Sequence, residues 1–582
     1  MTNQWIFNAP SAEEQTQTLH LAEQMNIDSV LAGLLVQRGI DSSDEARNFF
    51  WPKLNHLHDP FLIKDMDKAV MRIEKALANR EKMLIYGDYD VDGTTAVALV
   101  YKILKKYTSD IGYYIPDRYA EGCGISREGV EYARDNGYKL IIALDCGIKA
   151  VEKVALAKSY GIDFIICEHH TTDDRLPDAV AVLDSKREDD TYPYKELSGC
   201  GVGFKLMQGF IQRNKLDFSD LKNCLDLVAV SIASDIVPIT GENRVLAYHG
   251  LRQLNNNPSI GLRSIISVCG LSNHQITMND IIFKIGPRIN ASGRLDSGIE
   301  VVKLLISNNS SDADKLSKSI DELNEERRSL DEQTTNEATE MLKARADFEK
   351  RKSIVVYNSE WSKGIIGIVA SRLAEEYYRP TIVLTRTTNG LLNGSARSVQ
   401  GFDLYTAIDN CRDLLENFGG HLYAAGLSLK EENLEPFIER FEQYVAENIT
   451  KAQLTPQIEI DAEVEFSQFN SKFLKTLRLF APFGPGNTNP VFCTRKVKDN
   501  GGTKVVGKAL DHLKVDLCNS EGTHNMSGIA FHMSDFHESM KDNNMVDVCY
   551  TLEENTFLAH HSDNKNSDPN MQLMVKDIRC AE

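Results

Sequence analysis

Residues 84–95 read LIYGDYDVDGTT, an apolar run followed by aspartates at every second position. The apolar run predicts a buried strand. Alternate residues of an extended chain point the same way, so the side chains of Asp88, Asp90 and Asp92 converge just beyond that strand. Three converging carboxylates repel one another unless a multivalent cation neutralises them. This stretch therefore predicts a strand whose end holds a cation.

A calcium loop is the simplest alternative for aspartates at this spacing. Such a loop carries a glutamate at its twelfth position and follows a helix. Here the twelfth position is Leu99, and a strand leads into the aspartates. The calcium loop is therefore rejected.

The surrounding sequence alternates between strand-like and helical segments. Helical stretches such as 94–107 and 149–160 separate strand-like runs at 83–86, 111–115, 139–144, 163–167 and 179–183. This alternation predicts an α/β domain with a parallel, doubly wound sheet. In such a sheet, ligands bind beyond the carboxyl ends of the strands.

Further polar residues follow other strands of the same sheet. Asp145 follows one strand, and Glu168, His169 and His170 follow the next. Asp235 comes after the apolar run LVAVSIAS. Taken alone, Asp235 also fits a helix cap, and paired histidines also fit ordinary packing. Because several strand ends carry such residues at once, the pattern favours a metal site at one edge of the sheet.

The residue types indicate which metal and which chemistry. Carboxylates with one or two imidazoles suit manganese or magnesium better than zinc. There are enough carboxylates for two divalent ions about 3.5–4 Å apart, one activating water and the other stabilising the leaving oxygen of a phosphoryl centre. The sequence contains no G-x-x-x-x-G-K-[ST] phosphate loop, which argues against a nucleotide kinase. The prediction is hydrolysis of a phosphoester.

The composition is that of a globular protein with several domains. The 582 residues are 42% hydrophobic and carry a formal net charge of −19, which argues against a surface broadly covered with positive charge. A local basic groove is still compatible, because residues 491–515 hold six basic side chains against two acidic ones. The alternative for this segment is a solvated, charged hairpin.

Nothing in the sequence indicates a membrane or export. No stretch reaches the roughly 18 apolar residues of a membrane span, and the N-terminal residues lack a basic head followed by an apolar run. The 11 cysteines form no C-x-x-C pair and are typical of reduced thiols. We therefore expect a cytoplasmic protein without membrane contact.

The changes in residue pattern along the sequence divide the chain into five segments. Residues 311–350 contain no Gly or Pro, and apolar residues from Leu316 to Met341 and Leu342 recur at spacings near 3.5. This pattern predicts one connecting helix with a narrow apolar stripe, with a coiled coil as the less favoured alternative. The C-terminal third has short alternating segments with turns, typical of a small oligonucleotide-binding (OB) β-barrel. The expected segments are an N-terminal helical segment (1–78), a metal-binding catalytic domain (79–310), the connecting helix (311–350), a second α/β domain that binds substrate (351–452) and an OB-like nucleic-acid-binding domain (453–582).

Eight ordered motifs resemble the DHH phosphoesterase superfamily and, within it, the RecJ-type single-stranded-DNA-specific exonucleases. The motifs are GDYDVDGTTA (87–96), LDCGI (144–148), EHH (168–170), SIASDIVP (231–238), IGPRINASGR (285–294), WSKGIIGIVASRLAEEYYRP (361–380), GSARS (394–398) and GGHLYAAGL (419–427). The resemblance identifies 79–310 as a DHH domain and 351–452 as a DHH-associated domain.

The resemblance also implies roles for individual residues. The two divalent ions, manganese or magnesium, would be held by Asp90, Asp92, Asp145, His169 and Asp235, with Asp145 as the bridge. Asp88 would be a further ligand or a support, and His170 would act on the scissile phosphate or the leaving group. The implied substrate contacts are Arg288 and Asn290 on the DNA backbone, Arg118, Ser395 and Arg397 on a 5′-terminal phosphate, and His421 with Gly419 and Gly420 on the other wall of the cleft.

Three positions depart from the family pattern. Glu168 stands where the family has aspartate, Cys123 where an aromatic residue is usual, and Ser362 where histidine is usual. If the Glu168 carboxylate only orients His169, the extra methylene is tolerable; if it is a ligand, the rate or the metal preference suffers.

The resemblance implies a 5′→3′ exonuclease on single-stranded DNA in DNA repair and recombination, with a single-strand-binding protein and a helicase as partners. One alternative is a DHH phosphodiesterase or phosphatase acting on short nucleotides or polyphosphate, against which the extra C-terminal third argues. The other is a catalytically silent DNA-binding scaffold, against which the retained carboxylates argue.

Overall fold

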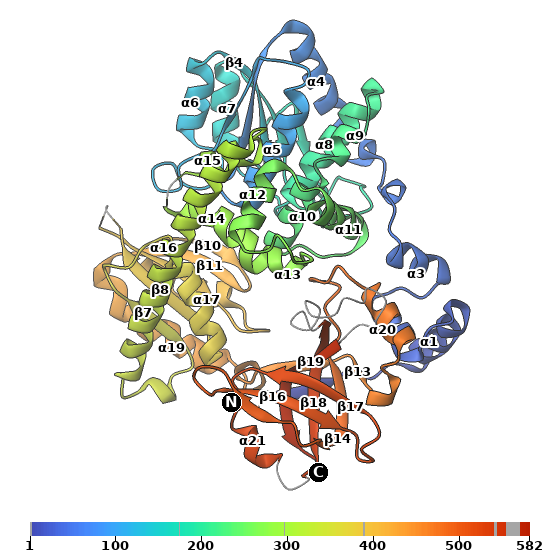
Figure 1. The fold of residues 1–582 in the computed structure, drawn as a ribbon. Helices are drawn as coiled ribbons and strands as arrows, with labels where there is room; N and C mark the ends of the chain where they lie inside the picture. Colours follow the sequence, from blue (N-terminus) through green and yellow to red (C-terminus); the bar gives the residue numbers. More distant parts are fainter. Residues whose placement is uncertain are drawn as a thin grey trace. The chain divides into compact units, whose positions relative to one another are not determined.

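The computed structural model describes residues 3–173, 175–295, 297–387, 390–540, 544–554 and 571–581. These residues form two compact units (Figure 1). The first unit contains Asp59–Asp235 and His249–Pro456, and the second contains Asn3–His58, Ile236–Tyr248 and the chain from Gln457 onward. All the residues expected to bind metal lie in the first unit.

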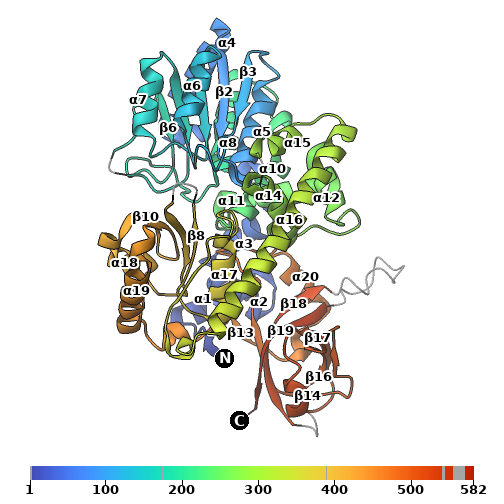
Figure 2. The same cartoon turned by 90° about the vertical axis from the view of Figure 1, so that its left-hand side faces the viewer.

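A five-stranded parallel sheet forms the centre of the first domain. Its strands are β2 (Lys82–Gly87), β3 (Ile111–Tyr114), β4 (Tyr138–Leu144), β5 (Asp163–Cys167) and β6 (Ala181–Leu183), in the spatial order β3–β2–β4–β5–β6. Helices lie on both faces of the sheet (Figure 2) and include α5 (Val91–Leu104), α6 (Arg127–Asp135), α7 (Val151–Ser159) and α8 (Gly199–Asn214). The predicted doubly wound parallel sheet is confirmed.

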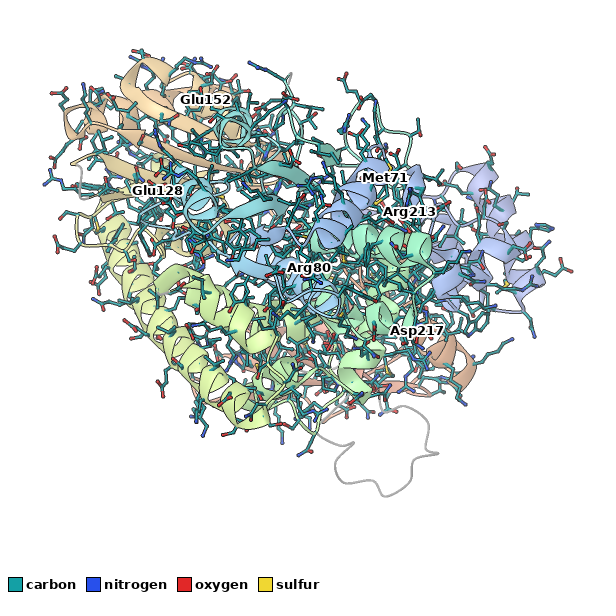
Figure 3. The ribbon with its side chains drawn as sticks, turned by 90° about the horizontal axis from the view of Figure 1, so that it is seen from above. Met71, Arg80, Glu128, Glu152, Arg213 and Asp217 are labelled. Carbon is teal, nitrogen blue, oxygen red and sulfur yellow. The ribbon has the colours of Figure 1, made fainter. Side chains whose placement is uncertain are left out.

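Burial explains why these strands are apolar almost throughout. Every residue of β2 after Lys82 is buried, and so is every residue of β4 except Lys139. Strands covered on both faces need an apolar side chain at nearly every position. Figure 3 views this domain from above and labels Arg80, which leads into β2 at the edge where the strands begin. The polar residues after the strands therefore lie at the opposite edge.

Helices complete this domain. They are α4 (Met66–Asn79), α9 (Ser219–Lys222), α10 (Leu225–Ser234), the second half of α11 (Gly241–Asn256), α12 (Ile260–Val268), α13 (Met278–Asp280), a π-helical turn (Ile281–Ile285), α14 (Gly286–Leu295) and α15 (Gly298–Leu305). The buried helix α10 packs against α5 and α8, and Asp235 is its C-cap. The run LVAVSIAS is thus a helix whose end presents Asp235 to the carboxyl edge of the sheet.

One long helix, α16 (Ser310–Lys343), connects this domain to the next. It ends at Lys343, before the expected residue 350, and Phe348 in a separate short turn packs into an apolar core with Leu342 and the second domain. Its buried side is partly polar: Asp331 is buried and binds Arg372 on the following helix at 2.6 Å. An apolar stripe alone does not describe this helix, and Met341, expected on the stripe, is exposed.

The second domain is built on a mixed five-stranded sheet. Its strands are β7 (Ile354–Tyr357), β8 (Thr381–Arg386), β9 (Leu392–Arg397), β10 (Leu415–His421) and β11 (Ala424–Leu429), in the order β10–β11–β9–β8–β7. Only β7 and β8 pair in parallel. The helices are α17 (Ile366–Tyr377), α18 (Leu404–Asp409) and α19 (Leu434–Asn448). The expected second α/β domain is present.

The second unit contains a closed β-barrel. The closed strands are β14 (Phe492–Asp499), β18 (Val546–Glu554), β19 (Met571–Cys580), β17 (Asn525–Ala530) and β16 (His512–Cys518). The short strands β13 (Ala462–Glu463) and β15 (Lys504–Val506) extend this sheet, and β12 (Gln457–Ile460) lies in a separate two-stranded sheet. The helices are α20 (Ser471–Arg478) and α21 (Phe536–Ser539). The barrel closes because β14 pairs with both β18 and β16. The predicted OB-like barrel is confirmed.

The N-terminal residues belong to the same unit as the barrel. Strand β1 (Gln4–Phe7) pairs in parallel with β12. Leu21, Leu31 and Phe50 come from the helices α1 (Ala12–Met25), α2 (Ser29–Val36) and α3 (Ser43–Phe50) and share one apolar core with the barrel. No helix in the described parts of the chain is long and apolar enough to cross a lipid bilayer.

Candidate metal centre

The carboxyl ends of three adjacent strands carry the candidate ligands. Asp88 and Asp90 follow β2, and Asp90 is also the N-cap of α5, where its Oδ1 accepts a hydrogen bond from the Gly93 amide at 3.0 Å. Asp145 follows β4, and His169 lies two residues beyond β5. Since β2, β4 and β5 are neighbours in the sheet, sequence-distant residues meet at one place.

The imidazole of His169 lies at the centre of this group. Its Nε2 is 3.1 Å from Oδ1 of Asp145. The same nitrogen is 3.6 Å from Oδ2 of Asp92 and 3.6 Å from Oδ2 of Asp235. The structure thus brings together four of the five residues expected to hold metal around one nitrogen. The fifth, Asp90, lies close enough for its charge to raise the pKa of Asp145 and of Asp235.

The N-terminus of α8 fixes the orientation of Asp92. Its two carboxylate oxygens accept hydrogen bonds from the amides of Gly199 at 2.6 Å and Cys200 at 2.7 Å, and Ser231 donates a third at 2.7 Å. Helix N-termini favour negative charge. A side chain at Gly199 would collide with Asp145, since a Cβ atom there would lie 2.6 Å from the Asp145 Cβ. Glycine therefore lets α8 approach the cluster closely.

The carboxylates destabilise one another's charged forms. Burial, together with the charges of Asp88 and Asp92, raises the pKa of Asp90 to about 7. Burial and the charges of Asp92 and Asp90 raise the pKa of Asp235 to about 8. The same causes raise the pKa of Asp145 well above its ordinary value. A divalent cation relieves this repulsion and lets all the carboxylates ionise.

The histidine at the centre has the form that a metal requires. Burial lowers the pKa of His169, which favours the neutral imidazole. Its Nδ1 is buried and, within the described residues, has no hydrogen-bond partner. A neutral imidazole among clustered carboxylates fits divalent manganese or magnesium.

His170 and Glu168 form a second pair beside the cluster. Nδ1 of His170 lies 2.7 Å from Oε2 of Glu168, and this hydrogen bond raises the pKa of His170 to about 9. Glu168 also accepts hydrogen bonds from the amides of His169 and His170, at 3.0 and 3.2 Å. The Glu168 carboxylate therefore orients the ring of His170 and holds the backbone of both histidines. The His170 side chain is about half exposed, at 53%.

Asp88 is held by the loop that contains Cys123. The Cys123 thiol donates to Oδ2 of Asp88 at 3.0 Å, and Oδ1 accepts from the amide of Tyr89 at 2.9 Å. Burial raises the pKa of both Asp88 and the Cys123 thiol. Asp88 lies at the border of the cluster, where a thiol takes a position expected to be aromatic.

Three arginines gather beside the metal cluster. The Arg118 guanidinium lies 5.0 Å from the centre of the Tyr89 ring. In the sequence, Tyr89 stands between Asp88 and Asp90. Arg397 donates to Ser395 at 3.0 Å and to Ser371 on α17 at 3.1 Å. Arg294, at the end of α14, donates to the carbonyl of Gly364 at 2.7 Å. Among the described residues, no carboxylate pairs with any of these arginines.

The arginines repel one another. Burial, with the charges of Arg118 and Arg327 nearby, lowers the pKa of Arg294 to about 10. Burial also lowers the pKa of Arg397. Positive groups that lack acidic partners are suited to an anionic ligand such as phosphate. Arg294, the last residue of the motif IGPRINASGR, was not predicted to contact substrate.

The other residues expected to contact substrate lie in different places and have different partners. Asn290 accepts a hydrogen bond from the Val91 amide at 3.1 Å and so lies at the start of α5, beside the aspartates. Arg288 forms an ion pair with Asp321 on α16 at 2.7 Å and is directed toward that helix. His421 ends β10 and is exposed beside Gly419, where a Cβ atom would meet nothing within 4 Å. The hydroxyl of Ser362 accepts a hydrogen bond from the amide of Gly364 at 3.3 Å.

Three family models match successive parts of the chain, and known proteins match nearly all of it. Family models match at residues 82–232 (DHH family, N-terminal domain), 351–447 (DHHA1 domain) and 460–577 (RecJ OB domain). The single-stranded-DNA-specific exonuclease RecJ of Bacillus subtilis is 33% identical over 580 residues, covering 99% of this chain and 71% of that protein. The chain belongs to the RecJ family. The predicted resemblance is therefore confirmed.

Other RecJ proteins match over similar lengths. The enzyme of the same name from Haemophilus influenzae is 31% identical, covering 90% of this chain and 92% of that protein. The solved structure of RecJ in complex with Mn²⁺ from Thermus thermophilus has a TM-score of 0.82 at 25% identity, covering 100% of this chain and 80% of that chain. A second solved structure, exonuclease RecJ bound to manganese, is 29% identical with a TM-score of 0.59, covering 69% of this chain and 98% of that chain.

Within this RecJ-family chain, the departure at Glu168 has a structural explanation. The longer side chain reaches back to the amides of His169 and His170 and to the ring of His170. The contacts of the Glu168 carboxylate are thus with the backbone of both histidines and with the ring of His170.

Proposed function

We propose that this protein is a metal-dependent 5′→3′ exonuclease that hydrolyses phosphodiester bonds of single-stranded DNA in DNA repair and recombination. The observation that carries this proposal is the cluster of buried carboxylates around His169, beside arginines that lack acidic partners among the described residues. The first group suits divalent cations and the second suits a terminal phosphate. Membership of the RecJ family supports the same substrate.

The proposed ligands hold two ions, manganese or magnesium. They are Asp90, Asp92, Asp145, His169 and Asp235, with Asp88 at the border of the cluster. When bound, such ions polarise the phosphoryl group and lower the pKa of the attacking water. Asp92 keeps its position because α8 and Ser231 hold both of its oxygens.

His170 is the proposed proton donor to the substrate. Glu168 holds its Nδ1 and raises the pKa of the ring to about 9, so the imidazole is charged at neutral pH. Its remaining N–H group is then available to a phosphate oxygen or to the leaving oxygen. The partial exposure of His170 leaves room for that contact.

The polarity of cleavage rests on the arginines. Arg118, Ser395 and Arg397, together with Arg294, form the proposed pocket for a 5′-terminal phosphate. Arg118 stacks on Tyr89, and Tyr89 stands between Asp88 and Asp90 in the sequence. A terminal phosphate bound by Arg118 therefore lies close to the carboxylate cluster. Only a free 5′ end supplies such a phosphate, which favours removal of nucleotides from that end. Asn290, His421 and, less directly, the ion-paired Arg288 are proposed to contact the strand further along.

The barrel supplies a second proposed contact with the DNA strand. Lys504 and Lys514 pair directly opposite each other on β15 and β16, and both side chains are exposed. Like charges at opposite positions destabilise a sheet. A phosphate backbone beside them compensates this repulsion.

The remaining proposals concern the cellular setting and the division of the chain. A single-strand-binding protein and a helicase are the proposed partners, and the cytoplasm is the proposed location. The proposed segments are those of the sequence analysis, 1–78, 79–310, 311–350, 351–452 and 453–582.

Degradation of end-labelled strands tests the proposal. With manganese, the protein is expected to release mononucleotides from the 5′ end of single strands and to leave blunt duplexes largely intact. Asp145→Asn is expected to abolish release, whereas Asp67→Asn, an exposed aspartate on α4, is expected to retain it. Release from the 3′ end first, or equal activity of Asp145→Asn and wild type, would overturn the proposal.

A further inference from the structure

Two histidines and an aspartate meet on the barrel, in the second unit. Asp511 and His512 stand at the start of β16, and His532 lies just after β17. These strands pair antiparallel with Leu513 opposite Ala530, so the beginning of one lies beside the end of the other. The amide of Ser534 donates to the carbonyl of Asp511 at 3.2 Å and closes this end of the hairpin.

The polar atoms of these three side chains converge. Oδ2 of Asp511 lies 2.6 Å from Nδ1 of His532, and Oδ1 lies 3.2 Å from Nδ1 of His512. One ligand atom from each residue lies within 4.8 Å of the other two. Metal–nitrogen bonds of about 2.1 Å in a tetrahedral site place neighbouring ligand atoms about 3.4 Å apart. The observed separations of 2.6 and 3.2 Å are those of hydrogen bonds and are shorter than that value, so the three side chains must spread slightly to take one ion between them.

The backbone around the cluster holds the two rings together. The amide of His532 donates to Nδ1 of His512 at 3.2 Å, and the ring centres are 4.7 Å apart. On the other side, a Cβ atom at Gly507 would lie 3.1 Å from the His512 ring and 3.4 Å from the Asp511 carboxylate. Gly507 has φ +95°, so a larger residue there is disfavoured by both space and conformation.

We propose that Asp511, His512 and His532 bind a divalent zinc ion, separate from the carboxylate cluster that serves catalysis. Imidazole nitrogens with one carboxylate suit zinc and its late first-row neighbours, whereas a site made mostly of carboxylates suits manganese and magnesium. The His532 side chain is 77% exposed, which leaves the remaining coordination positions to water. The ion links the end of β17 to the start of β16 and adds positive charge to the basic barrel.

Cobalt is the probe, because it binds at zinc sites and absorbs visible light. The metal-free full-length protein is dialysed against Co²⁺, and the bound equivalents and the visible spectrum are measured. His532→Asn removes the imidazole while asparagine still tolerates the left-handed backbone at this position, φ 56°. The matched control is His524→Asn, an exposed histidine in the turn between β16 and β17.

The catalytic cluster also takes up Co²⁺, but equally in all these proteins. Wild type and His524→Asn are expected to bind one equivalent more than His532→Asn, and zinc is expected to displace that equivalent. Asp511→Asn provides an independent variant with the same expected loss, should circular dichroism show that His532→Asn is misfolded. Equal stoichiometry in wild type and the folded variants would overturn the proposal.

Discussion

Nε2 of His169 lies 3.1 Å from Oδ1 of Asp145, although 24 residues separate the two in sequence. They follow the adjacent parallel strands β5 and β4, so the order of the strands in the sheet brings them together. Among the described residues, the one charged group within ion-pair distance of Asp145 besides His169 is His170, whose Nδ1 lies 4.0 Å from Oδ1 of Asp145. One imidazolium charge does not balance the several carboxylates gathered here. The cluster is therefore built for a cation that the protein takes up from solution.

The metal-free protein should lose stability as the pH rises. A carboxyl group whose pKa is raised by folding, as for Asp235 at about 8, contributes stability at low pH, and this contribution is lost as the pH rises through the folded pKa. We expect Asp235→Asn to unfold at about the same temperature as wild type near pH 5 and at a higher temperature near pH 9, both in a chelator. Thermal unfolding measures this difference.

Manganese should reverse that order, because the ion stabilises the ionised wild-type cluster and binds the variant less well. A wild-type unfolding temperature that rises relative to the variant between these pH values, without metal, would contradict the account.

The approach of α8 to the cluster predicts an effect of Gly199→Ala. The added methyl group would lie 2.8 Å from Oδ1 of Asp145, so either the helix or the carboxylate must move. We expect Mn²⁺ affinity to fall about 10- to 100-fold, as for other residues that support metal ligands. Calorimetric titration measures the affinity. Gly201→Ala in the same turn is the control, since its Cβ meets Ser198 Oγ only at 3.3 Å; equal losses in both variants would point to a general defect of the helix.

The Glu168–His170 pair predicts a shift in the pH dependence of the rate. Glu168 raises the pKa of His170 to about 9, so Glu168→Gln lowers that pKa toward its ordinary value. The activity of the variant should therefore decline at a lower pH on the alkaline side than that of wild type. A profile of kcat against pH measures this, with Glu152→Gln on the exposed face of α7 as the control (Figure 3). An unchanged alkaline limb would remove His170 from its proposed role.

The arginine cluster predicts a loss of preference for phosphorylated ends. Arg397→Met removes a charge-assisted hydrogen bond to phosphate, worth about 1.5–3 kcal/mol, or about 10- to 100-fold in KM. The ratio of kcat/KM for 5′-phosphorylated and 5′-hydroxyl strands should fall by that factor. Arg127→Met, an exposed arginine on α6, should retain the ratio. If Arg397→Met affected both kinds of end equally, the pocket would lie elsewhere.

Local sequence was sufficient to predict that most of the candidate metal ligands lie close together. Asp145 and His169 each follow an apolar strand pattern, and parallel strands bring their ends together whatever the details of packing. The expectation that Asp88, Asp90 and Asp92 continue in extended chain was wrong for Asp92, which lies in the first turn of α5, because Asp90 already caps that helix. Arg294 was missed because its neighbours in space, Arg118 and Arg397, come from other elements. Arg288 was expected to face the DNA because nothing in the sequence indicates its ion pair with Asp321 across α14 and α16.

Long-range packing was equally invisible in the sequence. The sequences of α1 to α3 predict short helices but not what these helices pack against. Only the structure shows Leu31 and Phe50 in one core with barrel residues more than 400 positions away, such as Val515. In α16, buried Asp331 interrupts the apolar pattern because Arg372 pairs with it from another helix. Such polar partners break the periodicity on which sequence-based prediction depends.

Anomalous diffraction from crystals soaked in Mn²⁺ tests the central claim most directly. Two peaks about 3.5–4 Å apart, among Asp90, Asp92, Asp145, His169 and Asp235, are the expected result. No peak at this edge of the sheet, or peaks only at other places, would contradict it.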